Sequence, residues 1–263
     1  MSTCVVLMYH VIDRPRASAE ARLCCPPESF RAQLEYLHRH NYTVVPLAEL
    51  ARSLREGIPL PHKATVITFD DGSSCAYSQA LPMLSEYGFP ATVFMVSGLV
   101  GRTNEWLRGA HFPERRMLSA AELRSLVAGR VDVGSHSVAH PWLARIPLQE
   151  ARDELKNSKA QLEDTIGGPV EHFAYPFGSY NEAVRDAAAE IGYSAACSTR
   201  WGKHHTKADL FALRRVEIMG QDSLFKFACK LRIATHHVPP IPEARHLLRR
   251  GLEKLGVVVP RPA

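Results

Sequence analysis

Short apolar segments alternate with helical patterns along most of this chain, and this alternation limits the folds open to it. The predicted strands are Cys4–Tyr9, Thr43–Val45, Val66–Phe69, Thr92–Val96, Val131–Val133, Phe173–Ala174, Ser194–Cys197 and Leu213–Ile218. Helical patterns fall between them, for example at Pro27–His40, at Leu47–Arg55 and on an apolar stripe from Ala151 to Ile166 that ends at Gly167. Strands separated by helices favour parallel pairing. The sequence therefore predicts an α/β protein, a (β/α) barrel of parallel strands with outer helices.

The length and composition suit one catalytic domain. A chain of 263 residues with 46% hydrophobic residues can bury a large core and falls in the size range of a single α/β barrel. The net charge of +5 is mild, and its basic excess is concentrated late in the chain. We expect one domain over residues 1–263, with a basic helical extension at about 222–263.

Polar side chains follow two of the predicted strands at the point where each strand ends. The sequence TFDDG (Thr68–Gly72) places Asp70 and Asp71 directly after a buried apolar run. The sequence HSVAH (His136–His140) follows the run that begins at Val131. Because parallel strands present their carboxyl ends at the same edge of a sheet, we expect these groups to lie close together.

The combination of two imidazoles and a carboxylate indicates a metal site. Such a set binds a transition metal and leaves positions open for water and substrate. A bound metal ion acidifies water, and adjacent aspartates can divide the work of ligand and base. Because His136 and His140 are four residues apart, one helical turn would bring them about 5–6 Å apart at Cβ. These motifs together predict metal-assisted hydrolysis.

Each motif has a simpler explanation when it is taken alone. Asp-Asp-Gly after a strand is typical of a turn or a helix N-cap. A pair of histidines at this spacing is a weak signal in a chain that contains 13 histidines. Their coincidence at the ends of two predicted parallel strands is what favours the metal site.

The two motifs resemble those of the polysaccharide deacetylases, carbohydrate esterase family 4, and the resemblance extends over most of residues 4–218. It implies a distorted barrel of seven strands. It also implies that Asp70 is the catalytic base and that Asp71, His136 and His140 hold one divalent ion. Zn²⁺ is the first choice for that ion, with Ni, Co, Mn or Fe as alternatives.

A third segment, FAYPFGSYN (Phe173–Asn181), resembles the segment of that family that forms a wall of the substrate groove. Ala174 stands where many members carry an arginine that orients the catalytic base. Arg215, in a late strand similar to one in a branch of the family, is the candidate replacement. A solvated charge at a strand end is the alternative for this residue, which we group with the substrate-binding residues.

The first strand, CVVLMYHVI (Cys4–Ile12), resembles the opening strand of the branch that contains poly-N-acetylglucosamine deacetylases, in which the motif order is permuted. The resemblance implies that His10 is the general acid. Imidazole changes its protonation near neutral pH, which suits protonation of a leaving amine. The alternative is a core histidine that is hydrogen-bonded to the backbone.

Four aromatic residues are predicted to contact a sugar. Trp106 lies in the irregular stretch Gly98–Met117, where it either stacks on a sugar ring or packs the loop. Trp142, Tyr175 and Phe177 are expected near the metal because of their positions in the motifs.

The late basic region has two interpretations. Leu248, Leu252 and Leu255 line one face of a possible helix, which either docks on the barrel or meets an anionic membrane surface or a lipid diphosphate. Nucleic-acid binding has no support beyond basic charge.

The six cysteines show no zinc-ligand spacing and are expected to be reduced, mostly buried thiols. With no signal peptide and no apolar stretch long enough to span a membrane, we expect a cytoplasmic protein, free or peripheral to the membrane.

The sequence therefore predicts a metal-dependent hydrolase that removes acetyl groups from an N-acetylhexosamine-containing glycan or glycan precursor, free or lipid-linked. One alternative is hydrolysis of a cyclic or small-molecule amide, of the allantoinase type. The other is a sugar-binding protein on the same fold that has lost turnover. The oligomeric state does not follow from the sequence.

Overall fold

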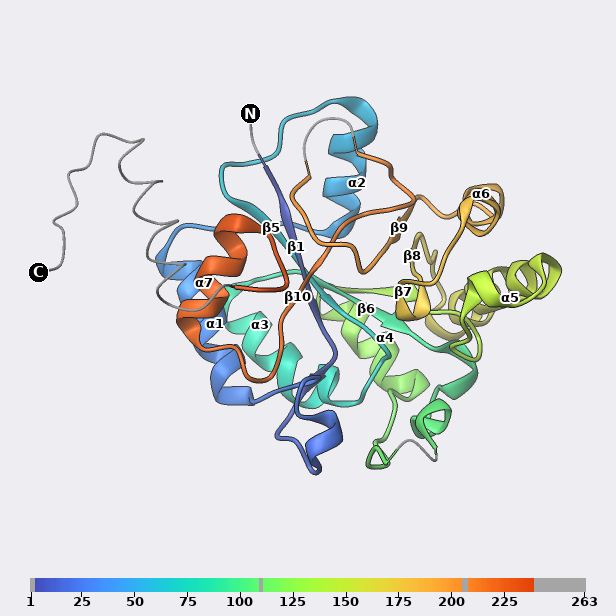
Figure 1. The fold of residues 1–263 in the computed structure, drawn as a ribbon, viewed down its shortest axis with the longest axis horizontal. Coiled ribbons are helices and arrows are strands. Elements are labelled where there is room, and N and C mark those ends of the chain that lie inside the picture. Colours follow the sequence, from blue (N-terminus) through green and yellow to red (C-terminus); the bar gives the residue numbers. More distant parts are fainter. Residues whose placement is uncertain (1–2, 109–110, 205–207, 239–263) are drawn as a thin grey trace, which may run out of the picture.

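Eight parallel strands form one sheet that curls around a common axis (Figure 1). The computed structural model describes residues 3–108, 111–204 and 208–238. The strands are β1 (Val5–Tyr9), β4 (Thr43–Val44), β5 (Ala64–Phe69), β6 (Ala91–Met95), β7 (Val131–Ser135), β8 (His172–Ala174), β9 (Ala195–Cys197) and β10 (Val216–Glu217). The path runs β10-β1-β5-β6-β7-β8-β9, with β4 paired to the start of β5. A separate parallel pair joins β2 (Val11–Ile12) to β3 (Cys24–Cys25).

The segment before β10 brings the two ends of the sheet together. Leu213 pairs with Cys197 of β9, and its backbone N–H donates to Ala196 O at 2.9 Å. Three residues later, Val216 pairs with Leu7 of β1. The seven strands of the path therefore form a distorted barrel, as expected from the alternation of strands and helices.

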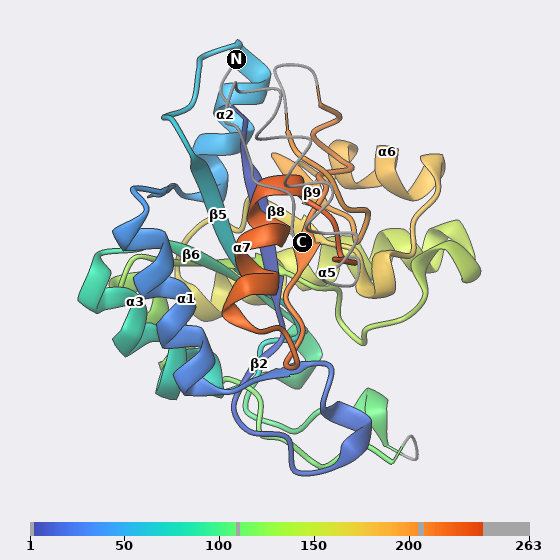
Figure 2. The ribbon, with the colours of Figure 1, turned by 60° about the vertical axis from the view of Figure 1, so that its left-hand side comes forward.

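Helices cover the outside of this sheet (Figures 1 and 2). They are α1 (Pro27–Arg39), α2 (Leu47–Glu56), α3 (Leu81–Tyr87), α4 (Ala120–Ala128), α5 (Leu148–Ile166), α6 (Glu182–Glu190) and α7 (Leu224–Ile233). One-turn helices occur at Ser18–Glu20, Ser97–Leu99, Glu105–Leu107, Leu143–Arg145 and Pro176–Gly178, and a π-helix at Ala76–Ala80. Local signals explain several boundaries: Ser119 and Glu122 form a capping box at the start of α4, and Gly167, with φ 71°, ends α5.

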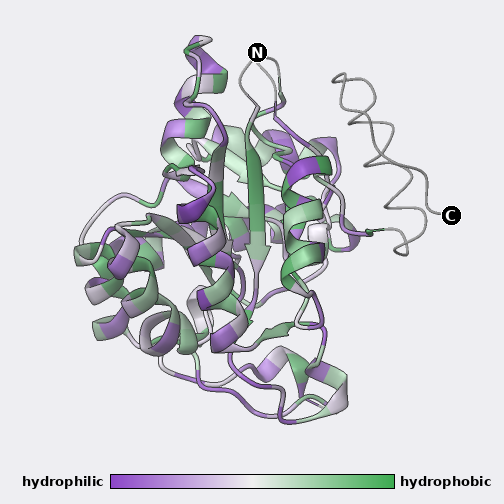
Figure 3. Ribbon diagram, turned by 90° about the vertical axis from the view of Figure 1, so that its left-hand side faces the viewer, coloured by the Kyte–Doolittle hydropathy of each residue, from purple (hydrophilic) through white to green (hydrophobic). Residues whose placement is uncertain are grey.

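The strand residues are divided between two apolar layers. Side chains that include Val6, Val66 and Phe94 fill the interior of the barrel. Their neighbours, such as Leu7 and Ile67, pack in a larger layer under the helices. Figure 3 shows hydrophobic strands at the centre and hydrophilic residues spread over the helices around them.

All six cysteines are buried and free, as expected for reduced thiols. Five of them take part in the apolar packing of the two layers, and Cys229 lies on α7.

The first part of the basic C-terminal region forms α7. This helix packs against α1, where the rings of Phe227 and Tyr36 lie 6.0 Å apart. The predicted helix with Leu248, Leu252 and Leu255 lies outside the described residues. Among the described residues, no helix is both long enough and apolar enough to span a membrane.

Candidate active site

The end of β5 delivers two aspartates to different partners. Pairing with β1 continues past the strand, because the Asp70 N–H donates to Tyr9 O at 2.9 Å. Asp71 and Gly72 then both adopt positive φ, 72° and 81°. A Cβ on Gly72 would lie 2.1 Å from Met95 Sδ, so only glycine fits this turn. The sharp turn lets Asp70 contact Arg215 while Asp71 contacts two histidines.

The histidine segment is a loop and not the helical turn that we expected. Ser137 and His140 have φ values of 67° and 61°, outside the helical region. Within the loop, the His140 N–H donates a hydrogen bond to Ser137 Oγ at 2.9 Å. It is also tied to the end of β6, because the N–H groups of Ser97 and Gly98 donate to the carbonyls of Ser137 and Val138, each at 3.0 Å.

Glu154 of α5 holds the same loop from the other side. The N–H groups of Val138 and Ala139 donate to Glu154 Oε2 at 2.7 and 2.9 Å. One carboxylate oxygen therefore satisfies two consecutive backbone donors that lie between the histidines. Nothing in the sequence pointed to Glu154, which is one of several acidic residues on an amphipathic helix.

Asp71, His136 and His140 converge as possible metal ligands. One candidate ligand atom from each lies within 4.8 Å of the others. The Nε2 atoms of His136 and His140 lie 3.5 and 3.4 Å from Asp71 Oδ1. His136 Nδ1 lies 2.7 Å from the carbonyl oxygen of Ala174. That oxygen can only accept, so Nδ1 carries a proton, and Nε2 is the ring atom that would bind a metal, as is usual for a histidine ligand oriented by a carbonyl.

The charge states of two of these groups suit a divalent cation. Burial opposes ionisation of Asp71, but the two imidazoles more than offset this and hold its pKa well below the usual value. Burial lowers the pKa of His140, and its interaction with the Asp71 carboxylate only partly opposes this. An ionised carboxylate beside imidazoles with free lone pairs is a donor set that Zn²⁺ and similar ions prefer.

Asp70 is held by Arg215 and is not part of the ligand cluster. Arg215 Nη1 and Nη2 donate to the two oxygens of Asp70 at 2.5 and 2.7 Å, and both side chains are almost completely buried. Burial alone would raise the pKa of Asp70, but the charge of Arg215 and its hydrogen bonds to the carboxylate lower it overall. Arg215 thus contacts the carboxylate that the proposed replacement arginine would orient. Because it is fully buried against Asp70, its placement among the substrate-binding residues was wrong.

His10 follows β1 on the same rim. It is partly buried, and its Nδ1 has no hydrogen-bond partner among the described residues, so that atom is not bonded to the backbone. Glu217 of β10 is a buried carboxylate that interacts with His10. Burial raises the pKa of Glu217, but the hydrogen bond and charge of Arg22 outweigh this and lower it. An ionised carboxylate near His10 was not anticipated from the sequence.

Three of the four predicted aromatic residues lie around the histidines. The rings of Trp106 and Phe177 are centred 4.8 and 4.5 Å from that of His140. Trp142 stacks on Phe177 at 4.3 Å with an angle of 6° between the planes. Both of these side chains remain about two-fifths exposed. They form an aromatic platform, Trp142 and Phe177, beside the ligand cluster.

Tyr175 does not belong to this platform. Its side chain is completely buried, its hydroxyl donates to Phe211 O at 3.0 Å, and its ring stacks on Tyr180. The prediction that Tyr175 contacts substrate is therefore wrong. Side chains alternate along a strand, and here Ala174 faces the barrel interior while Tyr175 points to the outer layer.

The model of the polysaccharide deacetylase family matches residues 57–196, which is more than half of the chain. The chain belongs to the polysaccharide deacetylase family. Members of this family are carbohydrate deacetylases, a class of metal-dependent hydrolases. The resemblance recognised from the two strand-end motifs is thereby confirmed.

Comparison with individual proteins agrees with this assignment. The putative polysaccharide deacetylase YxkH of Bacillus subtilis is 29% identical over 81% of this chain and 70% of its own length. The poly-β-1,6-N-acetyl-D-glucosamine N-deacetylase of Escherichia coli O157:H7 is 31% identical over 85% of this chain, which spans 38% of that enzyme. The structure of Streptococcus pyogenes deacetylase PplD in complex with acetate has a TM-score of 0.76 and 26% identity, covering 87% of this chain and 98% of PplD.

Glu154 provides a test of how the ligand loop is held. We expect Glu154→Ala to weaken metal affinity by about 10–100-fold, because partners that hold the ligands typically contribute that much. Glu154→Gln retains an acceptor oxygen and should recover most of the affinity. Calorimetric titration of Zn²⁺ into metal-free protein measures this.

Glu150→Ala is the matched control, since Glu150 lies on the same helix and is exposed. Equal affinities for Glu154→Ala and Glu150→Ala would show that the loop does not depend on this carboxylate.

Proposed function

We propose that this chain is a metal-dependent deacetylase that removes acetyl groups from an N-acetylhexosamine-containing glycan or glycan precursor. The observation that carries the proposal is the convergence of Asp71, His136 and His140 beside an arginine-held Asp70. A ligand set alone would also suit a structural ion. A second carboxylate that is outside the ligand set but next to it is what a hydrolytic site requires for proton transfer. Relatives named as poly-β-1,6-N-acetyl-D-glucosamine N-deacetylases support the substrate class.

The three ligands leave coordination positions for other groups, which is typical of catalytic and not of structural zinc sites. A divalent ion held there would supply a Lewis acid that polarises the acyl carbonyl and acidifies water. We favour Zn²⁺ because the donor set is two imidazole nitrogens and one carboxylate oxygen.

The chain's own residues move the protons in the proposed reaction. Asp70 takes a proton from the water that attacks the amide carbon, and Arg215 keeps the Asp70 carboxylate ionised and oriented. The C–N bond then breaks, and His10 donates a proton to the departing nitrogen. The products are acetate and the free amino sugar.

The aromatic platform of Trp142 and Phe177 supports a role in holding the sugar. The two rings stack on each other and Arg145 Cζ lies 4.2 Å from the centre of the Trp142 ring, but both side chains keep about two-fifths of their surface exposed next to the ligand cluster, where a pyranose ring can contact them. Trp106 contacts His140 and packs against the core, so we assign it a smaller role than Trp142 and Phe177 in contacting the sugar. The lipid linkage, the membrane contact of the C-terminal region and the cytoplasmic location remain predictions.

Acetate release tests the proposed function. The metal-loaded protein should release acetate from oligomers of N-acetylglucosamine and leave a cyclic amide such as allantoin intact. Asp70→Asn should retain the metal but lose about 10²–10⁴-fold in turnover, because the base is lost and the ligands are not. Asp164→Asn, an exposed position on α5, is the matched control.

Hydrolysis of the cyclic amide alone would favour the allantoinase type of reaction. Absence of turnover on all substrates, with metal bound, would favour a sugar-binding protein.

His10 is tested through the leaving group. An aryl acetate has a leaving group that needs little protonation, whereas the amine of an N-acetyl sugar must be protonated to depart. We therefore expect His10→Gln to reduce kcat/KM for the N-acetyl sugar far more than for the aryl acetate. If both substrates lose the same factor, His10 positions the site and another residue supplies the proton.

A further inference from the structure

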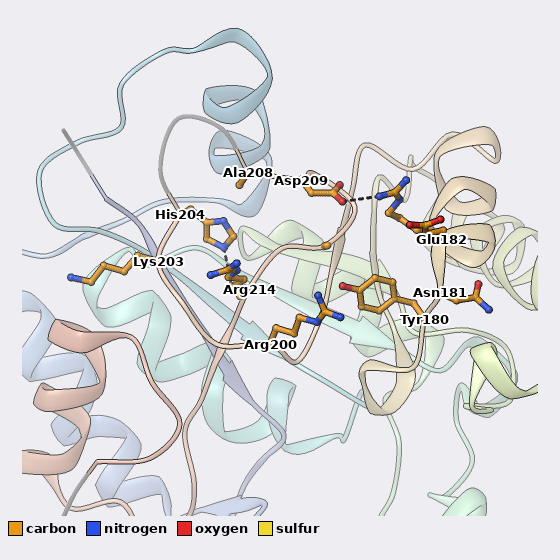
Figure 4. A pocket seen from close by; sticks show the side chains of 11 residues that line it. Tyr180, Asn181, Glu182, Arg200, Lys203, His204, Ala208, Asp209 and Arg214 are labelled. Carbon is orange, nitrogen blue, oxygen red and sulfur yellow. Dashed lines mark hydrogen bonds and ion pairs between the residues drawn. The ribbon is translucent and has the colours of Figure 1, made fainter.

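A hydrophilic hollow of about 520 Å³ lies outside the barrel, between α6 and the segment that joins β9 to β10. The described residues of this joining segment form no helix. No helix of these residues therefore packs on the outside of the barrel at this point, as helices do beside other strands. We call it the β9–β10 hollow. The residues that line it include Tyr180, Asn181, Arg185, Arg200 and Arg214. Figure 4 shows Tyr180 and Asn181 on one side, with Arg200 extending toward Tyr180 from the other. The volume is typical of ligand pockets.

The hollow carries arginines that no carboxylate neutralises. Arg200 Cζ lies 5.6 Å from the centre of the Tyr180 ring, and no carboxylate of the described residues pairs with Arg200 or Arg214. Arg185, by contrast, pairs with Asp209. Gly202 makes room for Arg214, because a Cβ there would lie 2.7 Å from Arg214 Cδ. Glu182 also lines the hollow, but the guanidinium groups of Arg200 and Arg214 outnumber its carboxylate. The hollow is therefore electropositive and suited to the oxyanions that arginine binds.

Both walls of the hollow are connected to the active site through short stretches of chain. Tyr180 is three residues from Phe177, so their Cα atoms are at most about 11 Å apart. On the opposite wall, Arg200 O accepts the N–H of Arg215, whose side chain holds Asp70. The two walls meet where Gly178 packs against Thr199. A glycan stacked on the platform of Trp142 and Phe177 would therefore reach the hollow within a few sugar units.

We propose that the β9–β10 hollow is a subsite for an anionic group, a carboxylate or a phosphate, carried by the glycan a few units from the residue that is deacetylated. Arg200 and Arg214 hold the oxyanion, and the Tyr180 ring supports the Arg200 guanidinium. Lys203 also lines the hollow, but Figure 4 shows its side chain pointing away from Tyr180, so we assign the oxyanion to the two arginines. This inference rests on the proposed function and specifies its substrate class as an acidic glycan.

The test compares two double variants that remove the same charge. Arg200→Gln/Arg214→Gln removes the unpaired cations of the hollow. Arg52→Gln/Lys156→Gln removes two exposed cations elsewhere and is the control. KM and kcat are measured on N-acetylglucosamine oligomers of equal length that are neutral, carry a glucuronate or carry a phosphate.

We expect the hollow variant to raise KM about tenfold for an acidic oligomer, with kcat and the neutral oligomer unaffected. The acidic oligomer whose KM rises shows whether the bound group is a carboxylate or a phosphate. The proposal is overturned if the hollow variant changes no KM, or if the control raises KM equally through its general loss of positive charge.

A binding measurement keeps this proposal separate from the proposed function. If the wild-type protein deacetylates none of these oligomers, the proposed function fails. Calorimetry with inorganic phosphate then tests whether the hollow binds an oxyanion. The wild type and the control should then bind phosphate about tenfold more tightly than the hollow variant. Equal affinities in all three proteins would overturn the subsite.

Discussion

The buried ion pair between Arg215 and Asp70 is the interaction on which the organisation of the site depends. Arg215 directly precedes β10, and its side chain donates to Ser198 O after β9, to Thr68 Oγ1 of β5 and to both oxygens of Asp70. Removing one partner of a buried pair costs about 3–5 kcal/mol, whereas an exposed pair such as Arg14–Glu28 contributes about 0–1 kcal/mol. The pair therefore ties the start of β10 to the end of β5 where the catalytic groups gather, and the bond from Arg215 to Ser198 O links the two ends of the sheet. It also keeps Asp70 out of the ligand cluster, so the two adjacent aspartates can perform different tasks.

Much of the fold followed from local patterns. Continuous apolar runs such as Val66–Phe69 indicated buried strands, and their polar ends placed Asp70, Asp71 and the two histidines at one rim. The conformation of the histidine loop did not follow, because its two positive φ angles depend on tertiary contacts from Glu154 and the end of β6. The spacing of four residues suggested a helical turn. In the structure, the two histidines with this spacing lie in a loop that Glu154 and the end of β6 hold in place.

Two further features could be identified only from the three-dimensional structure. Arg215 meets Asp70 only because β10 pairs with β1, which pairs with β5, and sequence separation gives no sign of this. Tyr175 lies in the third motif near the metal ligands, yet strand alternation turns its side chain into the outer layer. Motif positions therefore predicted which backbone segments border the site better than they predicted which side chains face it.

The central claim is that Asp71, His136 and His140 form one catalytic metal site, and titration of metal-free protein with Zn²⁺ tests it most directly. The account predicts about one equivalent bound tightly by the wild type, loss of that binding in His136→Ala, and retention in His62→Ala, whose histidine is exposed and far along the sequence from the site. Tight binding that is the same in all three proteins, or absent from the wild type, would contradict it.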